Sequence, residues 1–321
     1  MKFEVKNLVS GYISESGYTK VIQNLSFTVK DGEILGISGE SGSGKTTLLF
    51  SLFKALSMPG YIKEGSVEID GENIFEMDEE KLRKIRGEIV SFVPQGSQNS
   101  LNPVKKIIGQ FKDIIESHDM PMGMSEIINV LNIVHLDENV LDRYPHEISG
   151  GMKQRVIIAM ALLYSPKLII MDEPTTGLDV LVQYEILKTI KEIQAKLSLS
   201  IIFVTHDIAL LFQIADRVMV LYGGEIMEIG PYNQLLTKAK HPYTKLLLDS
   251  IPTMTLSIEK LASVPGEPIS FKNRPSGCVF STRCPYVRKE CTVKHPEEYL
   301  IENSVFRCDR YPEWTTEVRE Q

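Results

Sequence analysis

The sequence has little of what marks a nucleic-acid-binding, secreted or membrane-spanning protein. It holds 35 basic against 42 acidic residues, a formal net charge of −7, and shows no Lys/Arg cluster, whereas a nucleic-acid surface needs a basic stripe. The first residues lack the basic head and apolar core of a signal peptide, and no apolar run approaches the length that crosses a bilayer. We therefore expect a cytoplasmic protein that binds no nucleic acid.

Cysteine is absent from most of the chain. The four cysteines all lie in its last part, at Cys278, Cys284, Cys291 and Cys308. In a reducing compartment, such clustering favours a metal site over disulfides. The 321 residues suffice for one large or two ordinary domains, and a hydrophobic content of 43% is enough to build a core.

One stretch matches the phosphate-binding loop pattern G-x-x-x-x-G-K-[ST]. Residues 39–46 read GESGSGKT, preceded by the apolar run EILGIS (33–38) and followed by the helical pattern TLLFSLFKAL (47–56). The sequence therefore predicts a strand, a glycine loop and a helix in this order.

The chemistry of this loop follows from backbone geometry. Glycines at 39, 42 and 44 can take positive φ, so that successive N–H groups form an anion nest at a helix N-terminus. Lys45 is then expected to reach the β- and γ-phosphates of a nucleotide, and the Thr46 hydroxyl to bind Mg²⁺.

Polar residues follow three further strand candidates. The run KLIIMD (167–172) ends in Asp172, which could hold Mg²⁺ through water, and the next residue, Glu173, could act as general base. Gln95 follows the run EIVSFVP (88–94), at the strand end where open α/β sheets bind ligands.

Two more motifs stand at ends of predicted elements. His206 follows the strand 200–205 and could contact a γ-phosphate or cap the next helix. Ser149-Gly150-Gly151 precedes the apolar helix VIIAMALLY and is either a phosphate nest or a simple helix start.

The rest of the chain predicts an α/β core with additions. Strands are expected at 3–9 and 21–29 around a turn at 10–20 that holds Tyr12 and Tyr18, and again at 65–71, forming an antiparallel sheet. The periodicity of 96–142 is helical, with a break at 120–124. A helix at 180–197 and a hairpin of 217–221 with 224–228 complete the pattern.

Five separated segments, GESGSGKT, Gln95, ISGGM, LIIMDE and His206, agree in identity and order with one family. In them the chain resembles an ABC-type ATPase over about residues 1–236. The resemblance implies a P-loop NTPase (RecA-like) core, an antiparallel β subdomain and a helical subdomain at about 96–155. It also implies a sandwich of two cassettes, in which the Ser-Gly-Gly of each closes over the ATP of the other.

The resemblance assigns roles to residues of this chain. Glu173 would be the catalytic base, Gln95 would sense Mg²⁺ and the γ-phosphate, and His206 would be the switch; Mg²⁺ would be held through Thr46, Gln95 and Asp172. The partner's ATP would meet Ser149, Gly150, Gly151 and Met152, where Met152 departs from the more frequent Gln, and Asp179 would lie at the dimer interface. The expected ATP-binding residues are Tyr12, which could stack on the base, and Gly39, Glu40, Ser41, Gly42, Ser43, Gly44, Lys45, Thr46 and Thr47.

Further segments resemble the ATPase subunits of dipeptide and oligopeptide permeases. They are SLNP (100–103), HPYTKLL (241–247) and VPGEP (264–268). The resemblance implies ATP-driven peptide import at the cytoplasmic face of the membrane. The partners would be a second ATPase subunit, with a paralogue favoured, two transmembrane permease subunits and an extracytoplasmic substrate-binding protein.

The last part of the chain, 237–321, is expected to be a cysteine-rich extension. Residues 253–273 hold Pro265 and Pro268 and few large apolar residues, which predicts a linker. The four cysteines of segment 277–310 match the ligand number of tetrahedral zinc or of a [4Fe–4S] cluster. The wide spacing suits a cluster, and the motif GC-x-F-x-x-RCP resembles the permease ATPases that bind one. Zinc with the four cysteines, zinc with His295 replacing one of them, and four free thiols stay open as alternatives.

Two other functions also stay open. One is a soluble ABC ATPase of DNA repair or translation, although such proteins typically have tandem cassettes, long coiled coils or basic arms. The other is the ATPase of an importer for nickel or another small solute.

Overall fold

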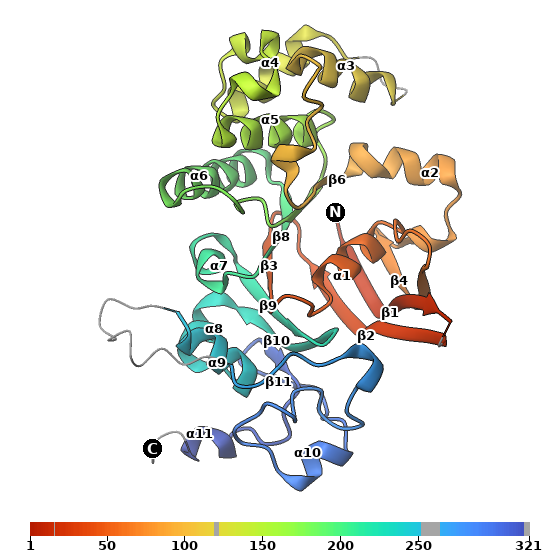
Figure 1. Ribbon diagram of the computed structural model, residues 1–321, viewed down its shortest axis with the longest axis vertical. Coiled ribbons are helices and arrows are strands. Elements are labelled where there is room, and N and C mark those ends of the chain that lie inside the picture. Colours follow the sequence, from red (N-terminus) through yellow and green to blue (C-terminus); the bar gives the residue numbers. More distant parts are fainter. Residues whose placement is uncertain (16, 119–121, 252–263, 318–321) are drawn as a thin grey trace. The chain divides into compact units, whose positions relative to one another are not determined.

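The computed structural model describes residues 1–15, 17–118, 122–251 and 264–317 (Figure 1). The chain divides into two compact units. The first comprises Met1, Val29–Ile34 and Glu76–Val204, and the second comprises Lys2–Thr28, Leu35–Phe75 and Thr205–Gln321.

The first unit is built on parallel strands. Strands β6 (Val90–Val93), β7 (Leu168–Asp172) and β8 (Ser200–Thr205) pair in parallel, with β7 in the middle. Every residue of β7 and β8 is buried. Because both faces are covered, these strands read as continuous apolar runs, which explains why the sequence predicted them.

The first unit also contains α-helices. They are α2 (Glu79–Lys84), α3 (Ile107–Glu116), α4 (Met124–Ile133), α5 (Gly150–Leu162) and α6 (Val180–Leu197). The predicted helical insertion is confirmed by α3 and α4, while residues 119–121 of the predicted break lie outside the described residues.

The second unit contains an antiparallel sheet of order β2-β1-β4-β5, with β1 at Phe3–Ser14, β2 at Gly17–Val29, β4 at Gly60–Ile69 and β5 at Glu72–Asn73. The antiparallel subdomain is therefore confirmed. The prediction of a turn over residues 10–20 is wrong, because β1 and β2 continue through it. The Gly and Ser residues there suggested a long turn, but backbone pairing extends Ser10–Tyr12 along β4.

The same unit holds a second group of strands. Strand β3 (Ile34–Ser38) runs parallel to β9 (Arg217–Tyr222), which forms a hairpin with β10 (Glu225–Pro231). Strand β12 (Ser304–Phe306) pairs with β10, and β11 (Tyr299–Ile301) pairs with β12. The C-terminal extension thus continues the sheet of this unit.

The helices of the second unit follow these strands. They are α1 (Lys45–Leu52), α7 (Ile208–Ile214), α8 (Tyr232–Lys238), α9 (Pro242–Asp249), α10 (Lys289–Val293) and α11 (Glu313–Glu317). Helix α1 ends earlier than predicted, and residues 252–263, most of the predicted linker, lie outside the described residues. Within the described ranges, none of the helices combines the length and apolar character needed to span a membrane.

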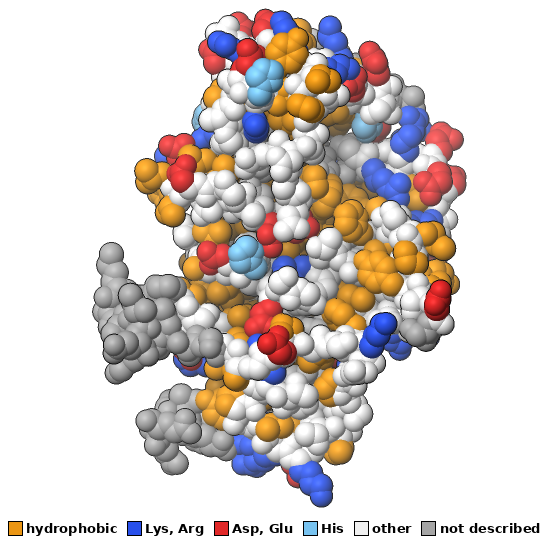
Figure 2. Space-filling model, viewed as in Figure 1, with side chains coloured by type: hydrophobic (Ala, Val, Ile, Leu, Met, Phe, Trp, Pro, Cys, Tyr) orange, Lys and Arg blue, Asp and Glu red, His pale blue; other side chains and the backbone are white. Residues whose placement is uncertain are grey.

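The surface carries charges of both signs. On the face shown in Figure 2, acidic and basic side chains of the described residues alternate with hydrophobic ones rather than separating into large single-sign areas. This mixture agrees with the modest net charge of −7.

Candidate active site

The phosphate loop lies between β3 and α1, as predicted. Gly42 and Gly44 adopt φ of +77° and +102°, the left-handed region in which a side chain would be strained. Gly39 does not need positive φ, which corrects the expectation. A Cβ there would stand 2.2 Å from the carbonyl oxygen of Leu221 in β9, so glycine is required by the close approach of the two backbones.

The side chain of Lys45 folds back onto the backbone of the phosphate loop. Its Nζ donates to the carbonyl oxygens of Gly39 at 2.6 Å and Glu40 at 2.9 Å, and the residue is only 8% exposed. Ser43 N–H also donates to the Glu40 carbonyl, at 3.1 Å. The backbone of Glu40 thus anchors both the turn and the lysine that is expected to meet phosphate.

Tyr12, the tyrosine favoured for base stacking, lies beside helix α1. The Tyr12 hydroxyl is 3.2 Å from Thr47 Oγ1, and the tyrosine is half-buried. Tyr18 instead packs edge-on against Tyr61, with ring centroids 6.2 Å apart. Stacking on a nucleotide base stays a prediction for Tyr12.

His206 follows β8 and is exposed. Helix α7 is capped by its neighbour, because Asp207 Oδ1 accepts the Ala209 N–H at 2.9 Å. The capping role considered for His206 therefore belongs to Asp207.

In the first unit, the acidic pair stands at the end of β7. Asp172 is its last residue and is 3% exposed, and Glu173 follows with φ of +47°, an uncommon conformation for a side chain of this size. Glu173 Oε2 accepts hydrogen bonds from Gln95 Nε2 at 3.0 Å and Thr176 Oγ1 at 3.1 Å. The structure thus joins Gln95 to Glu173 and adds Thr176, which no sequence motif had indicated.

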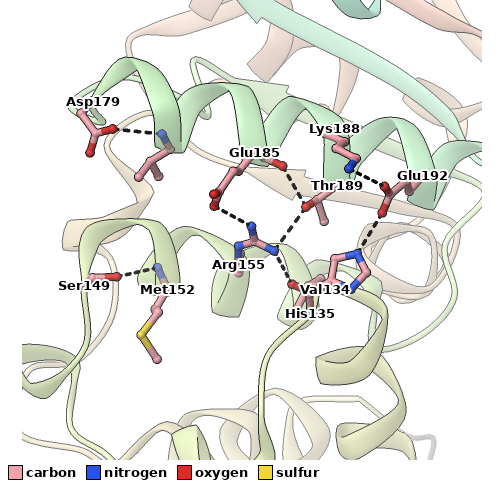
Figure 3. A network of polar contacts seen from close by, with 11 residues as sticks. Val134, His135, Ser149, Met152, Arg155, Asp179, Glu185, Lys188, Thr189 and Glu192 are labelled. Atoms are coloured by element: carbon pink, nitrogen blue, oxygen red, sulfur yellow. Dashed lines mark hydrogen bonds and ion pairs between the residues drawn. The ribbon is translucent and has the colours of Figure 1, made fainter.

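The Ser-Gly-Gly motif begins helix α5 (Figure 3). Ser149 is the N-cap, and its Oγ accepts the Met152 N–H at 3.3 Å. A Cβ on Gly151 would stand 2.7 Å from Val182 Cγ1, so this glycine allows α5 to approach α6. Asp179 caps α6 in the same way, because its Oδ1 accepts the Val182 N–H at 3.0 Å.

Arg155 connects these two helices (Figure 3). Its Nη1 donates to the Val134 carbonyl at 2.9 Å and Thr189 Oγ1 at 3.3 Å, and its Nη2 lies 3.4 Å from Glu185 Oε2. The helices that carry Ser149 and Asp179 are therefore held by a shared polar network.

All four cysteines line one pocket in the second unit, together with His241 and Phe280. Burial, together with the charges of Cys284 and Cys308, raises the pKa of Cys278 to about 12. Among the residues that the structure describes, however, no three Cys, His, Asp or Glu side chains form a group that could hold a metal ion.

His295 does not join these cysteines in lining the pocket. Its Nε2 lies 2.7 Å from Glu225 Oε2. That hydrogen bond is the main reason why the pKa of His295 lies above its ordinary value. The geometry therefore gives no support to zinc bound by His295.

The expected site residues are divided between the units. Tyr12, the phosphate loop, His206 and the cysteines belong to the second unit. Those of the first unit are Gln95, Ser149, Gly150, Gly151, Met152, Asp172, Glu173 and Asp179.

Comparison with known proteins places both parts of the sequence. Residues 22–176 match the family model described as ABC transporter, and residues 227–291 match the oligopeptide/dipeptide transporter C-terminal region. The second match includes three of the cysteines and stops before Cys308.

Relatives align over nearly the whole chain. The chain is 40% identical to the dipeptide transport ATP-binding protein DppD of Caldanaerobacter subterraneus, covering 96% of this chain and 97% of that protein. It is 39% identical to the oligopeptide transport ATP-binding protein OppD of Haemophilus influenzae, over 90% and 91% of the two chains.

Among solved structures, a dimeric bacterial ABC transporter cassette, MJ0796, is 28% identical with a TM-score of 0.63, covering 72% of this chain and 98% of that one. The cassette cbiO1 of Clostridium perfringens is 27% identical with a TM-score of 0.62, over 74% and 90% of the two chains. The chain therefore belongs to the ABC transporter family of ATP-hydrolysing cassettes, in the group that carries the oligopeptide/dipeptide transporter C-terminal region.

Proposed function

We propose that this ATPase drives the import of dipeptides or oligopeptides. The observation that carries the proposal is the similarity to peptide-transport ATP-binding proteins over more than nine-tenths of both chains, including the C-terminal region. The partners are two transmembrane permease subunits, an extracytoplasmic substrate-binding protein and a second cassette, which we infer to be a paralogue. The chain works as a peripheral subunit at the cytoplasmic face of the membrane.

In the second unit, the phosphate loop binds the nucleotide. The N–H groups around Gly42 and Gly44 surround the phosphates, and Lys45 exchanges its loop carbonyls for phosphate oxygens. Ser41, Ser43 and Thr47 belong to the same binding segment, Tyr12 stacks on the base, and His206 contacts the γ-phosphate.

In the first unit, Glu173 accepts a proton from the attacking water, and Gln95 orients Glu173 through their hydrogen bond. Gln95 and Asp172 would bind Mg²⁺ here, and in the second unit the Thr46 hydroxyl would do the same; the ion would offset the negative charge of the phosphates. Ser149, Gly150, Gly151 and Met152 serve the ATP of the partner cassette, with Asp179 at the interface.

We further propose that Cys278, Cys284, Cys291 and Cys308 hold a [4Fe–4S] cluster. Support comes from the four thiol donors around one pocket, a number that fits the four corners of a cubane. The cluster would supply a covalent core to this segment.

Anaerobic purification tests the cluster. We expect a brown protein with a broad visible absorbance and near-equal amounts of iron and sulfide. If the purified protein is colourless and contains zinc, the four cysteines bind zinc and not a cluster. If it contains no metal, they are free thiols.

Reconstitution tests the transport function. The chain is assembled in vesicles with its permease subunits and partner cassette, and ATP hydrolysis is measured with binding protein and either dipeptide, oligopeptide or Ni²⁺. Stimulation by peptide supports the proposal. Stimulation by Ni²⁺ alone would make the chain a metal-importer ATPase, and co-purification with ribosomes or DNA would place it outside transport.

A further inference from the structure

An arginine of the cysteine segment is bonded to the phosphate loop. Arg283 Nη1 donates to Glu40 Oε2 at 2.6 Å, and Arg283 Nη2 donates to Glu40 Oε1 at 3.1 Å. The two residues are 243 positions apart in the chain and both lie in the second unit. Glu40 follows the first glycine of the loop, and Arg283 directly precedes Cys284.

The arginine is fixed on all sides. Its side chain is 4% exposed, and the remaining donors reach the carbonyls of Pro265 at 2.6 Å and Val264 at 3.2 Å and the Tyr222 hydroxyl at 3.3 Å. A planar guanidinium with all three nitrogens engaged holds a carboxylate in one orientation. Arg283 is therefore a rigid partner for Glu40.

Glu40, whose carboxylate is bonded to Arg283, also accepts a hydrogen bond from Lys45. The Glu40 carbonyl accepts from Lys45 Nζ at 2.9 Å, and the Glu40 N–H donates to the Tyr243 hydroxyl at 3.1 Å. Both the backbone and the carboxylate of Glu40 are thus fixed. A shift of this residue would move the carbonyl that positions the lysine.

The charge of Glu40 also needs an explanation. A carboxylate in a loop that binds phosphates repels the ligand, because like charges at short range in a partly buried site are unfavourable. The guanidinium of Arg283 neutralises this negative charge by direct contact with both carboxylate oxygens of Glu40.

The same short segment also forms the wall of the cysteine pocket. Phe280 lines the pocket, and its ring packs on Tyr222 and Tyr243 with centroids 5.2 and 5.1 Å apart. These two tyrosines are the ones whose hydroxyls contact Arg283 and Glu40. The cysteine segment and the phosphate loop therefore share one packed cluster.

We propose that Arg283 is a positioning residue of the nucleotide site: it neutralises Glu40 and fixes the loop, so that the cysteine segment sets the affinity for nucleotide phosphates. This inference rests on the proposed role of the phosphate loop. It makes the C-terminal extension part of the nucleotide-binding machinery of its own chain.

The test is a double-variant cycle on the full-length chain, with the dissociation constant for MgADP measured by calorimetry. Arg283→Gln leaves Glu40 charged and unpaired, and we expect binding to weaken about tenfold. Arg283→Gln combined with Glu40→Gln should recover most of the lost affinity. A merely structural role of Arg283 would give no such recovery.

Arg274→Gln is the matched control. Arg274 Nη2 also makes a buried ion pair, 2.6 Å from Glu225 Oε1, but it does not touch the loop. We expect this variant to bind MgADP as wild type does. Equal weakening by Arg274→Gln, unchanged binding by Arg283→Gln, or a double variant as weak as Arg283→Gln would each overturn the inference.

Two further measurements distinguish a failure of the Arg283 proposal from a failure of the phosphate-loop assignment. If Arg283→Gln does not fold, the double variant decides, because binding about tenfold weaker than wild type by that variant would contradict the neutralising role. Lys45→Ala reports on the proposed function itself. If wild type and Lys45→Ala bind MgADP equally, the phosphate-loop assignment fails and the inference falls with it, whereas a failure of Arg283 alone leaves that assignment intact.

Discussion

Gln95 and Glu173 meet through a hydrogen bond of 3.0 Å, from the Gln95 amide Nε2 to the Glu173 carboxylate Oε2. They are 78 positions apart and follow β6 and β7, which pair in parallel. Parallel strands bring their carboxyl ends to the same edge of a sheet, and this places the amide on the carboxylate.

Glu173→Gln should retain nucleotide binding but stop hydrolysis. The substitution keeps the shape of the side chain and removes its ability to accept a proton, so we expect turnover to fall by at least about a hundredfold. ATP hydrolysis is measured in the assembled transporter, beside MgADP affinity. Glu192→Gln, which removes an exposed carboxylate on α6, is the control, and normal hydrolysis by Glu173→Gln would refute the assignment.

Ser149→Ala should affect both stability and activity. Loss of the N-cap of α5 should cost about 1 kcal/mol in the free energy of unfolding. Asp78→Ala removes the N-cap of α2, where Asp78 Oδ1 accepts the Lys81 N–H at 2.8 Å, and should cost a similar amount. If Ser149 also serves the partner's ATP, only Ser149→Ala lowers hydrolysis in the assembled transporter; equal activity of both variants contradicts that role.

Arg155→Met should destabilise the first unit. The methionine keeps much of the apolar stem but leaves the Val134 carbonyl and Thr189 without their donor, at a cost of ~1–3 kcal/mol. Urea unfolding measures the change. Lys188→Met, whose exposed ammonium lies 4.0 Å from Glu192, should change stability by less than about 0.5 kcal/mol; an equal effect of the two variants would exclude the network as the cause.

The pair of His295 and Glu225 should make stability depend on pH. The hydrogen bond to Glu225 raises the pKa of His295 in the folded state, so the folded chain binds this proton more tightly than the unfolded chain. The His295–Glu225 pair contributes fully to the free energy of unfolding below the ordinary histidine pKa of 6.5. This contribution is lost as the pH rises through the higher pKa that His295 has in the folded chain. Arg274 and Arg307 also face Glu225, whose pKa is lowered, so Glu225 stays ionised across this range.

Thermal unfolding between pH 6 and 9 measures this effect. We expect the melting temperature of wild type to decrease with rising pH above ~6.5, and His295→Gln to show a smaller decrease. His135→Gln, which removes an exposed histidine 2.9 Å from Glu192, is the control and should follow wild type. Parallel curves for wild type and His295→Gln would contradict the prediction.

Local signals explain what the sequence could predict. Asp179 is a good N-cap and the residues after it have helical periodicity, so α6 was predicted with its observed bounds of Val180–Leu197. Strand β8 was equally clear as a continuous apolar run. The phosphate loop was recognised from the spacing of Gly39, Gly44 and Lys45.

Contacts between residues far apart in the chain could not be predicted from local sequence signals. Nothing near Glu40 in the sequence indicates Arg283, and Gly39 is needed because of Leu221 in a distant strand. The turn over 10–20 was wrong because pairing with β4 overrides the local preference of Gly11 and Ser14. The roles of the site residues and the domain boundary at residue 236 stay predictions.

Strand β12 has a consequence for shortened versions of the chain. It covers one side of β10, with Phe306 opposite Glu228 and Val305 opposite Ile229. Removing the residues after 250 would leave the backbone N–H and C=O groups of this side of β10 without their strand partner. Such an uncovered sheet edge is a template for pairing with another molecule, so a cassette trimmed to its nucleotide-binding part should self-associate and precipitate.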